Sequence, residues 1–436
     1  MNKTRVGGVV VAAVALALTA ACSSSGTTGG AATTGAAPSG AGTTAGCSPV
    51  TINYWHAYSS DGPEVKQLET VIIPAFEKAN PCITVKDTAV PYDDLHQKLI
   101  TAAAGGQLPD VVRSDIIWVP ELANLGVLDS LDTDMPGFQD LASSTYDGAL
   151  GTAKWGGHYY GLPLDTNTLV QLVNPAVLQQ AGLQPATTMD QFKSNADALK
   201  AKGLLGYADS DLKGWNLLPF IWSFGGDIVS PDGTKASGYV NSPQTVQAVQ
   251  FVYDLYKAGE LSNYITQSGK TSDNDDFGTA KVGTIFGGPW MWPIFQSSYP
   301  DLKFQAAQIP SGKGGSVSVV GGEDVVVMAD SPQKDADYAF VKYLLSDDAQ
   351  LAMAKIGQMS VLKSLGDQEA QVNSYYAPFI QQLATAKPRP ATPAWNDMDG
   401  AMEARLQQAF LGDGNIQAAM DDLATQFDGM LAKYQK

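Results

Sequence analysis

Segments with a strand pattern and segments with a helix pattern alternate from about residue 50 onward, and this alternation limits the possible folds more than any other feature. Val50–Trp55 is a strand-like run, and apolar residues at helical spacing follow from Pro63. Ile83–Val90 repeats the strand pattern, and Asp93–Ala104 repeats the helix pattern, which ends at two glycines. Strand, helix, strand and helix in succession predict an α/β fold with a doubly wound parallel sheet.

The α/β pattern starts again after one short stretch, Gly161–Asn167. An apolar run ends there in polar residues, and another strand-like run follows. We interpret this stretch as the first crossing between two lobes, with Asp165 and Asn167 at the floor of the cleft between them. Further on, Thr188 and Gln191 form a capping box that begins a new helix.

Two more strands, Val317–Val320 and Val325–Met328, are predicted on either side of a polar segment that begins with two glycines. Two long amphipathic helices follow near the C-terminus, and their apolar stripes are typical of core packing. The folded part, from about Cys47 to Lys436, is large for one domain and fits two.

The N-terminus has the pattern of a secretory signal peptide over residues 1–21. Two positive charges precede the apolar run Val6–Ala21, which ends in small residues. Cys22 follows directly and resembles the lipidated cysteine of a bacterial lipobox, although Leu18 lies one place early. The alternative is ordinary signal cleavage, with Cys22 incidental. Residues 22–46 are almost wholly Ser, Thr, Gly and Ala, which predicts a flexible tether between a membrane anchor and a folded body.

The net charge of the chain limits the classes of partner that it can bind. Removal of Lys3 and Arg5 with the signal peptide leaves 25 basic residues against 44 acidic ones, a net charge near −19. This charge argues against a nucleic acid or an anionic membrane surface as partner.

Cys47 and Cys82 each precede a strand-like run, so their sulfurs would lie side by side if the two strands are neighbours in a parallel sheet. We therefore predict a disulfide.

The sequence has no signature of an enzyme, a metal site or a cofactor site. No phosphate loop or nucleophile elbow is present, and the histidines are scattered without ligand spacing.

The tryptophans say more about a possible ligand than these motifs do, because ligands in open α/β sheets lie beyond the carboxyl ends of the strands. A flat ring there can bind the C–H face of a sugar while polar groups bind its hydroxyls. Such tryptophans can equally be core or cleft wall, but Trp290 follows a Gly-Gly-Pro turn that cannot bury a ring deeply. Four fall at predicted strand ends or beside glycine-rich turns: Trp55, Trp222, Trp290 and Trp292.

Several motifs, in order and spacing, resemble those of family 1 extracellular solute-binding proteins, the sugar-capturing subunits of bacterial ABC importers. The resemblance covers the chain from about Val50 to the end. The motifs are YWHAYS at 54–59, LPDVV at 108–112, WVPELA at 118–123, GLPLDTN at 161–167, WSFGGD at 222–227, GPW at 288–290, GGE at 321–323 and KPRP at 387–390.

The resemblance implies a maltose-binding-protein-like fold of type II, as in periplasmic binding proteins. Two doubly wound α/β lobes would be joined by more than one crossing and would close on a ligand by hinge motion. Lobe one would comprise residues 48–162 plus 318–366, and lobe two residues 167–310 plus 370–436. One departure concerns Leu172-Val173, where many relatives have a tyrosine that contacts the ligand. The ligand contacts implied are Asp61, Asp115, Asp165, Asn167, Trp222, Trp290, Gly322, Glu323 and Arg389.

The function implied is that of a monomeric, non-catalytic carrier. It would be lipid-anchored at the extracellular face of the cell membrane, and it would hand an oligosaccharide such as maltose or trehalose to the transmembrane subunits of an ABC permease, without a cofactor. Two alternatives stay open. Abundant acidic residues allow a secreted glycoside hydrolase, and the same fold could bind a solute other than a sugar.

Overall fold

The computed structural model describes residues 47–60, 62–267 and 273–435. The predicted signal peptide, Cys22, the tether and Asp61 lie outside the described residues. From Ser48 onward the chain forms one compact unit. No helix within the described part of the chain is long and apolar enough to cross a membrane.

A six-stranded sheet forms the centre of the first lobe, in the order β12-β11-β3-β1-β2 with β6 beside β11, counted over the described residues. β1 pairs in parallel with β2 and with β3, which confirms the parallel unit predicted from the alternation. β11 runs antiparallel to β3 and β6, so the sheet is mixed and not wholly parallel. The strands are β1 (Val50–His56), β2 (Ile83–Ala89), β3 (Val111–Asp115), β6 (Leu162–Thr168), β11 (Val319–Val327) and β12 (Lys387–Pro388).

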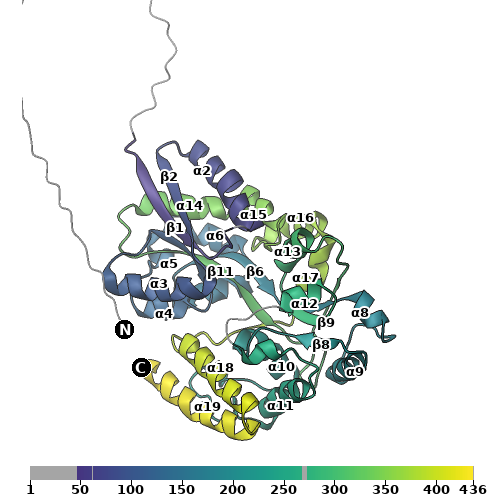
Figure 1. The fold of residues 1–436 in the computed structure, drawn as a ribbon. Coiled ribbons are helices and arrows are strands. Elements are labelled where there is room, and N and C mark those ends of the chain that lie inside the picture. Colours follow the sequence, from purple (N-terminus) through teal and green to yellow (C-terminus); the bar gives the residue numbers. More distant parts are fainter. Residues whose placement is uncertain (1–46, 61, 268–272, 436) are drawn as a thin grey trace, which may run out of the picture. The chain divides into compact units, whose positions relative to one another are not determined.

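Helices cover both faces of this sheet, because successive residues of its strands point to opposite sides. Val111 of β3 packs in one apolar cluster with Phe340 of α14, whereas Val112 packs in another with Leu99 of α3. Figure 1 shows the strands between these layers. The helical segments are α1 (Pro63–Gln67), the π-helical turn η1 (Leu68–Ile72), α2 (Ile73–Ala79), α3 (Tyr92–Gly105), α4 (Val119–Asn124), α5 (Leu131–Asp134), α6 (Phe138–Ser144), α7 (Asp147–Leu150), η2 (Gly151–Ala153), α14 (Lys334–Leu344), α15 (Asp347–Ala354), η4 (Lys363–Leu365) and α16 (Gly366–Val372).

β11 is one continuous strand, so the prediction of two strands around a glycine turn is wrong. The register of its pairing with β6 shifts between Glu323 and Asp324, as at a β-bulge. Gly322 has φ = 133°, and a Cβ there would lie 2.3 Å from the carbonyl oxygen of Asp165. The glycines therefore permit a close approach of two strands, and they do not end the strand.

A second sheet, in the order β10-β7-β9-β8, forms the centre of the second lobe. β8 and β9 are parallel, whereas β7 is antiparallel to both β9 and β10. Only Leu169 separates β6 from β7, so the chain passes from the first sheet to the second immediately after the stretch predicted as a crossing. The strands are β7 (Val170–Val173), β8 (Leu205–Ala208), β9 (Val282–Gly287) and β10 (Gln305–Ala307), and a separate ribbon is formed by β4 (Lys154–Trp155) and β5 (His158–Tyr159).

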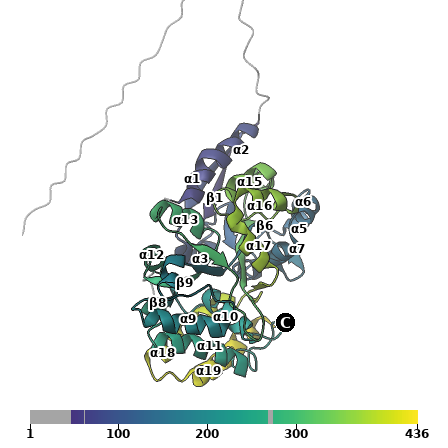
Figure 2. The ribbon, with the colours of Figure 1, turned by 90° about the vertical axis from the view of Figure 1, so that its right-hand side faces the viewer.

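The two long C-terminal helices pack on the helices of the second lobe, as Figures 1 and 2 both show. Met398, Leu406, Ile416 and Leu423 are buried in the same apolar cluster, which confirms the prediction of core packing. The helical segments are α8 (Pro175–Gln179), α9 (Met189–Lys200), α10 (Gly214–Ser223), α11 (Pro243–Lys257), η3 (Asn263–Thr266), α12 (Asp273–Gly278), α13 (Met291–Ser298), η5 (Ser374–Tyr376), α17 (Ala377–Leu383), α18 (Trp395–Leu411), α19 (Ile416–Leu431) and η6 (Ala432–Tyr434).

Two local predictions have direct counterparts in the structure. The hydroxyl of Thr188 caps α9 by accepting a hydrogen bond from the backbone N–H of Gln191 at 3.2 Å. The Gln191 side chain completes the cap one residue earlier than predicted, because it accepts from the N–H of Thr187 at 2.9 Å. Cys47 and Cys82 are both disulfide-bonded. The strands that follow them are neighbours, but the pairing of these two cysteines with each other stays a prediction.

Candidate ligand-binding cleft

A cleft with a volume of about 730 Å³ is lined by residues of both lobes. Of the predicted contacts, six line it together. They come from the end of β3, from β6 and β11, from the start of α13 and from the segment after β12. These residues are Asp115, Asn167, Trp290, Gly322, Glu323 and Arg389.

Two predicted contacts lie elsewhere. Asp165 lies behind the cleft wall, where it borders a small cavity of about 20 Å³. Trp222 is in helix α10 and not beyond a strand, and its ring is buried in the core of the second lobe. Its indole Nε1–H donates to Asp227 Oδ1 at 3.0 Å, so the only polar group of Trp222 is already bound. Neither residue lines the cleft.

Arg389 and Asp115 form an ion pair in the cleft wall. Arg389 Nη2 donates to Asp115 Oδ1 at 3.1 Å, and the two residues are only 8% and 7% exposed. Asp115 also accepts from the Tyr92 hydroxyl at 2.6 Å and from the N–H of Ile117 at 2.9 Å. Asp115 is therefore held in one orientation by three donors, which keeps its charge compensated inside the protein.

A second buried arginine, Arg113, joins two carboxylates at the cleft wall. Arg113 Nη2 lies 3.0 Å from Asp165 Oδ2 and 2.6 Å from Glu323 Oε2, and its guanidinium lies 4.2 Å from the centre of the Tyr58 ring. Burial raises the pKa of Glu323 well above its usual range; Arg113 opposes this rise, and Asp165 adds to it. One guanidinium cannot fully compensate two buried carboxylates, so Glu323 retains a proton more readily than an ordinary glutamate does.

Two tryptophans form an aromatic wall on the side of the second lobe. The rings of Trp215 and Trp290 have their centroids 6.2 Å apart at an angle of 34°. The guanidinium of Arg389 lies 5.1 Å from the centre of the Trp215 ring. A Cβ on Gly321 would lie 2.5 Å from the Trp215 ring and 2.3 Å from Asn167 Oδ1, so the glycine makes room for both side chains.

A hydrogen-bonded group bridges the two lobes at the cleft. Asn396 of α18 donates through Nδ2 to Glu121 Oε2 of α4 at 2.7 Å. His96 of α3 lies 2.7 Å from the same Glu121 oxygen, and its ring stacks on Trp118 with centroids 5.3 Å apart. We call these three residues, Asn396, Glu121 and His96, the interlobe bridge, because they connect helices of the first lobe to α18 of the second.

Acidic side chains supply most of the charge in the cleft. Asp399 accepts from the N–H of Gly214 at 2.6 Å. Burial raises the pKa of Asp399 to about 6, although the Gly214 hydrogen bond and the charges of Arg389 and Lys213 oppose the rise. Among the described residues, no group of three or more His, Cys, Asp or Glu side chains could hold a metal ion. The residues that line the cleft present hydrogen-bonding groups and aromatic faces.

Sequence reasoning missed several residues of this cleft. Trp215 carries a weak signal, since it follows a glycine at the start of a helix, but it lies outside the motifs that suggested a site. Arg113 lies two residues before Asp115 within a strand, where nothing distinguishes it from a core position. Asn396 and Asp399 belong to an amphipathic helix, and their helical spacing fits a solvated face as well as a site.

Comparisons with known proteins agree with this architecture. A protein of Brucella abortus (strain 2308), named only as a binding protein, is 26% identical over 372 residues, which cover 82% of this chain and 88% of that protein. A maltotriose-binding protein of Pyrococcus abyssi is 23% identical over 409 residues, covering 90% and 82%. The structure is similar to that of the GacH receptor of Streptomyces glaucescens, with a TM-score of 0.80 at 24% identity over 89% of this chain and 100% of that chain.

This likeness shows a two-lobed binding-protein fold. The family model described as bacterial extracellular solute-binding protein matches residues 59–351, which is more than half of the chain. The chain therefore belongs to the family of bacterial extracellular solute-binding proteins.

Proposed function

We propose that this protein binds an oligosaccharide, such as maltose or trehalose, and delivers it to the transmembrane subunits of an ABC importer. The observation that carries the proposal is the arrangement of Trp215 and Trp290 beside the Arg389–Asp115 ion pair in one cleft. Sugars need both kinds of group, because a pyranose ring has apolar C–H faces and a rim of hydroxyls.

Unused hydrogen-bonding capacity in the cleft supports a ligand rich in hydroxyls. Among the described residues, Asn167 Oδ1 and Arg389 Nε are buried without a hydrogen-bond partner. A ligand hydroxyl can donate to the amide oxygen and accept from the guanidinium. A ligand that lacks those hydroxyls would leave these buried groups unpaired, which is a strong basis for selectivity.

Hinge closure follows from the way in which the chain connects the lobes. β6 and β11 pair in the first sheet. The chain continues from β6 into the second lobe, and it returns from the second lobe into β11. We propose residues 48–162 plus 318–366 and residues 167–310 plus 370–436 as the bodies that move. A ligand favours the closed state only through its additional contacts there. An oligosaccharide between Asp115 of the first lobe and Trp290 of the second would supply such contacts.

The relatives support a sugar as the ligand class. The Pyrococcus protein is named for maltotriose, and the GacH receptor is described in complex with acarbose. We further propose that the protein acts as a monomer without enzymatic activity. We place it at the extracellular face of the cell membrane, anchored by a lipid on Cys22. Intact-mass analysis of the protein isolated from its native membrane tests the anchor, because lipidation at Cys22 removes residues 1–21 and adds acyl chains.

A calorimetric titration with maltose, trehalose and longer glucans tests the ligand class. We expect saturable binding of one sugar per protein molecule, with the sugar recovered unchanged. Hydrolysis of the sugar during incubation would favour a glycoside hydrolase instead. Binding of an amino acid, a polyamine or an iron chelate, with no sugar bound, would move the protein to another ligand class.

A further inference from the structure

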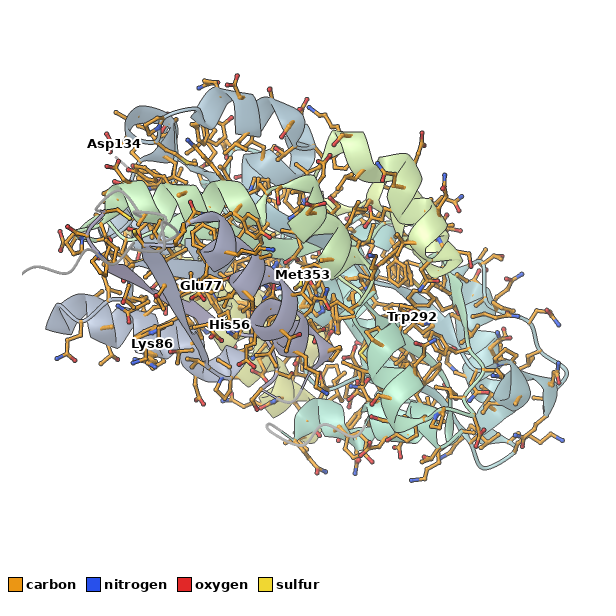
Figure 3. The ribbon with its side chains drawn as sticks, turned by 90° about the horizontal axis from the view of Figure 1, so that it is seen from above. His56, Glu77, Lys86, Asp134, Trp292 and Met353 are labelled. Atoms are coloured by element: carbon orange, nitrogen blue, oxygen red, sulfur yellow. The ribbon has the colours of Figure 1, made fainter. Side chains whose placement is uncertain are left out.

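We propose that the second lobe carries a second sugar site, separate from the cleft and lined by residues of α13, of the segment 299–306 and of η5. A pocket with a volume of about 590 Å³ lies there. It shares no lining residue with the cleft. Trp292, which is labelled in Figure 3, belongs to its wall. The choice of a sugar as ligand rests on the proposed function, whereas the pocket itself does not.

Helix α13 separates the two sites. Trp290 and Ile294 line the cleft, whereas Trp292, Phe295 and Gln296 line the second pocket. Trp290 is the N-cap of α13 and lies four residues before Ile294, so the two share one side of the helix, whereas Trp292, midway between them, lies on the opposite side. The same helix therefore serves both sites with different faces, and a ligand in the pocket does not occupy the cleft.

Aromatic rings form the apolar part of the pocket. Trp292 and Tyr375 are stacked, with centroids 6.2 Å apart at an angle of 27°. Phe304 meets Tyr375 edge-on at 5.5 Å and 81°. All three residues are half-buried. Flat rings in the wall of a pocket are suited to the C–H face of a pyranose.

The polar part of the pocket contains two groups whose hydrogen bonds are unmade. Asn373 Oδ1 accepts from the N–H of Tyr375 at 3.0 Å, which fixes the amide so that its Nδ2 is turned away from that N–H. Within the described part of the chain, neither Asn373 Nδ2 nor the Tyr375 hydroxyl has a hydrogen-bond partner, and both atoms are buried. Unpaired buried polar groups are uncommon in folded proteins, and such a group in a pocket wall is a natural partner for a ligand hydroxyl after a small side-chain rotation.

The pocket carries little charge, because its one lysine is exposed to solvent. Lys303 is the only charged residue among those that line it within the described chain, and no acidic side chain lines it, although the whole protein has a net charge of −17. The remaining polar groups of the lining residues are neutral, and the Tyr299 hydroxyl among them already donates to Asp275. They come from Trp292, Gln296, Tyr299, Gln305 and Ser374. Neutral donors and acceptors around aromatic faces fit a sugar residue, and the lack of an acidic side chain disfavours a polyamine.

The test uses the mature protein and follows the indole N–H signals of its tryptophans by nuclear magnetic resonance during a titration with maltose. The signal of Trp292 is assigned with the variant Trp292→Phe. We expect the Trp292 signal to shift in a saturable manner at millimolar maltose, independently of any tighter phase seen at Trp215 and Trp290. Tyr375→Phe, which removes only the hydroxyl, should weaken the Trp292 phase severalfold, and Asn373→Ala should weaken it further.

The cleft variant Trp290→Ala separates this inference from the proposed function. A Trp292 phase that persists in Trp290→Ala supports the second site even if the cleft binds no sugar. Maltose, trehalose and glucose are each raised to 100-fold above the protein concentration and then to the limit of solubility. A Trp292 signal that does not move over this range overturns the second site even if the cleft binds sugar. Equal Trp292 shifts in wild type and in both pocket variants, each with an unchanged melting temperature, would also contradict it.

Discussion

Arg389 and Asp115 lie 274 residues apart in the sequence, and they meet in the wall of the cleft with Arg389 Nη2 3.1 Å from Asp115 Oδ1. The same guanidinium lies 5.1 Å from the centre of the Trp215 ring. One arginine thus orders an acidic side chain of the first lobe and an aromatic ring of the second. Because both neighbours line the cleft, any ligand there meets groups whose positions depend on Arg389.

Replacement of Arg389 by alanine should weaken sugar binding by roughly 10- to 100-fold, because a hydrogen bond to a charged group contributes about 1.5–3 kcal/mol. Arg389→Lys should recover only part of the affinity, since an ammonium group lacks the planar fork of the guanidinium. Arg405→Ala is the matched control, because Arg405 pairs with Asp422 at the protein surface. Calorimetry with the bound sugar measures all three variants, and equal affinities in Arg389→Ala and wild type would remove Arg389 from the site.

Trp215→Ala and Trp290→Ala should each weaken binding by at least roughly tenfold, because aromatic side chains at the centre of a binding site typically contribute 2 kcal/mol or more. The rings are neighbours, so the two losses should not add in the double variant. Trp155→Ala is the control, since Trp155 is half-buried in β4 and does not line the cleft. If only Trp290→Ala had an effect, Trp215 would be a supporting wall and not a ligand contact.

The interlobe bridge should favour the arrangement of the lobes in which Asn396 reaches Glu121. Asn396→Ala removes this hydrogen bond. Because the Glu121 side chain is 24% exposed and water can replace the lost donor, we expect affinity to fall only about two- to tenfold, as for a contribution near 0.5–1.5 kcal/mol, together with faster dissociation. Asn241→Ala controls for loss of a surface amide, because Asn241 donates to Asp421 and neither residue lines the cleft. Stopped-flow fluorescence measures both rates. Tighter binding in Asn396→Ala would mean that the bridge opposes closure.

Glu369 should make stability depend on pH. Its side chain is 3% exposed, and burial raises its pKa from the usual value to about 7, although a hydrogen bond from the Ser360 N–H opposes the rise. The folded protein therefore holds the proton more tightly than the unfolded chain does. The stabilisation is complete below the unfolded pKa and is lost as the pH rises through the folded value near 7.

Glu369→Gln imitates the protonated form and keeps an oxygen for the Ser360 N–H. At pH 8 this variant should be more stable than wild type by roughly 2–3 kcal/mol, and at pH 4 the two should be nearly equal. Urea unfolding at both pH values measures the difference, with the exposed residue Glu69→Gln as the control. A variant that is less stable than wild type at pH 8 would show that Glu369 is ionised and compensated in the folded protein.

The parallel core of the first lobe could be predicted from local pattern alone, because β1, β2 and β3 alternate with helices at short range. The crossing beside Gly161–Asn167 could be predicted for the same reason. The continuity of β11 could not, because two adjacent glycines are typical of a turn, and only its pairing with β6 and β3 keeps that segment extended. A tertiary contact overrode local propensity there.

Six residues of the cleft could be anticipated through motif resemblance, but the partners that fix them could not. The pairing of Arg389 with Asp115, and that of Arg113 with Glu323, joins segments far apart in the sequence, which periodicity does not reveal. Trp222, in contrast, is predicted as a ligand contact but does not line the cleft. A tryptophan beside a Gly-Gly pair resembles a cleft residue, yet its place within α10 directs it into the core.

The central claim is that the cleft binds an oligosaccharide through Trp290 and Arg389. Its most direct test is calorimetry of the mature protein with maltose and trehalose, repeated with Trp290→Ala and Arg389→Ala. We predict stoichiometric binding of at least one of these sugars by the wild type, and clearly weaker binding by both variants with folding retained in circular dichroism. Absence of binding to either sugar and to longer glucans, or binding that is unchanged in both variants, would contradict the claim.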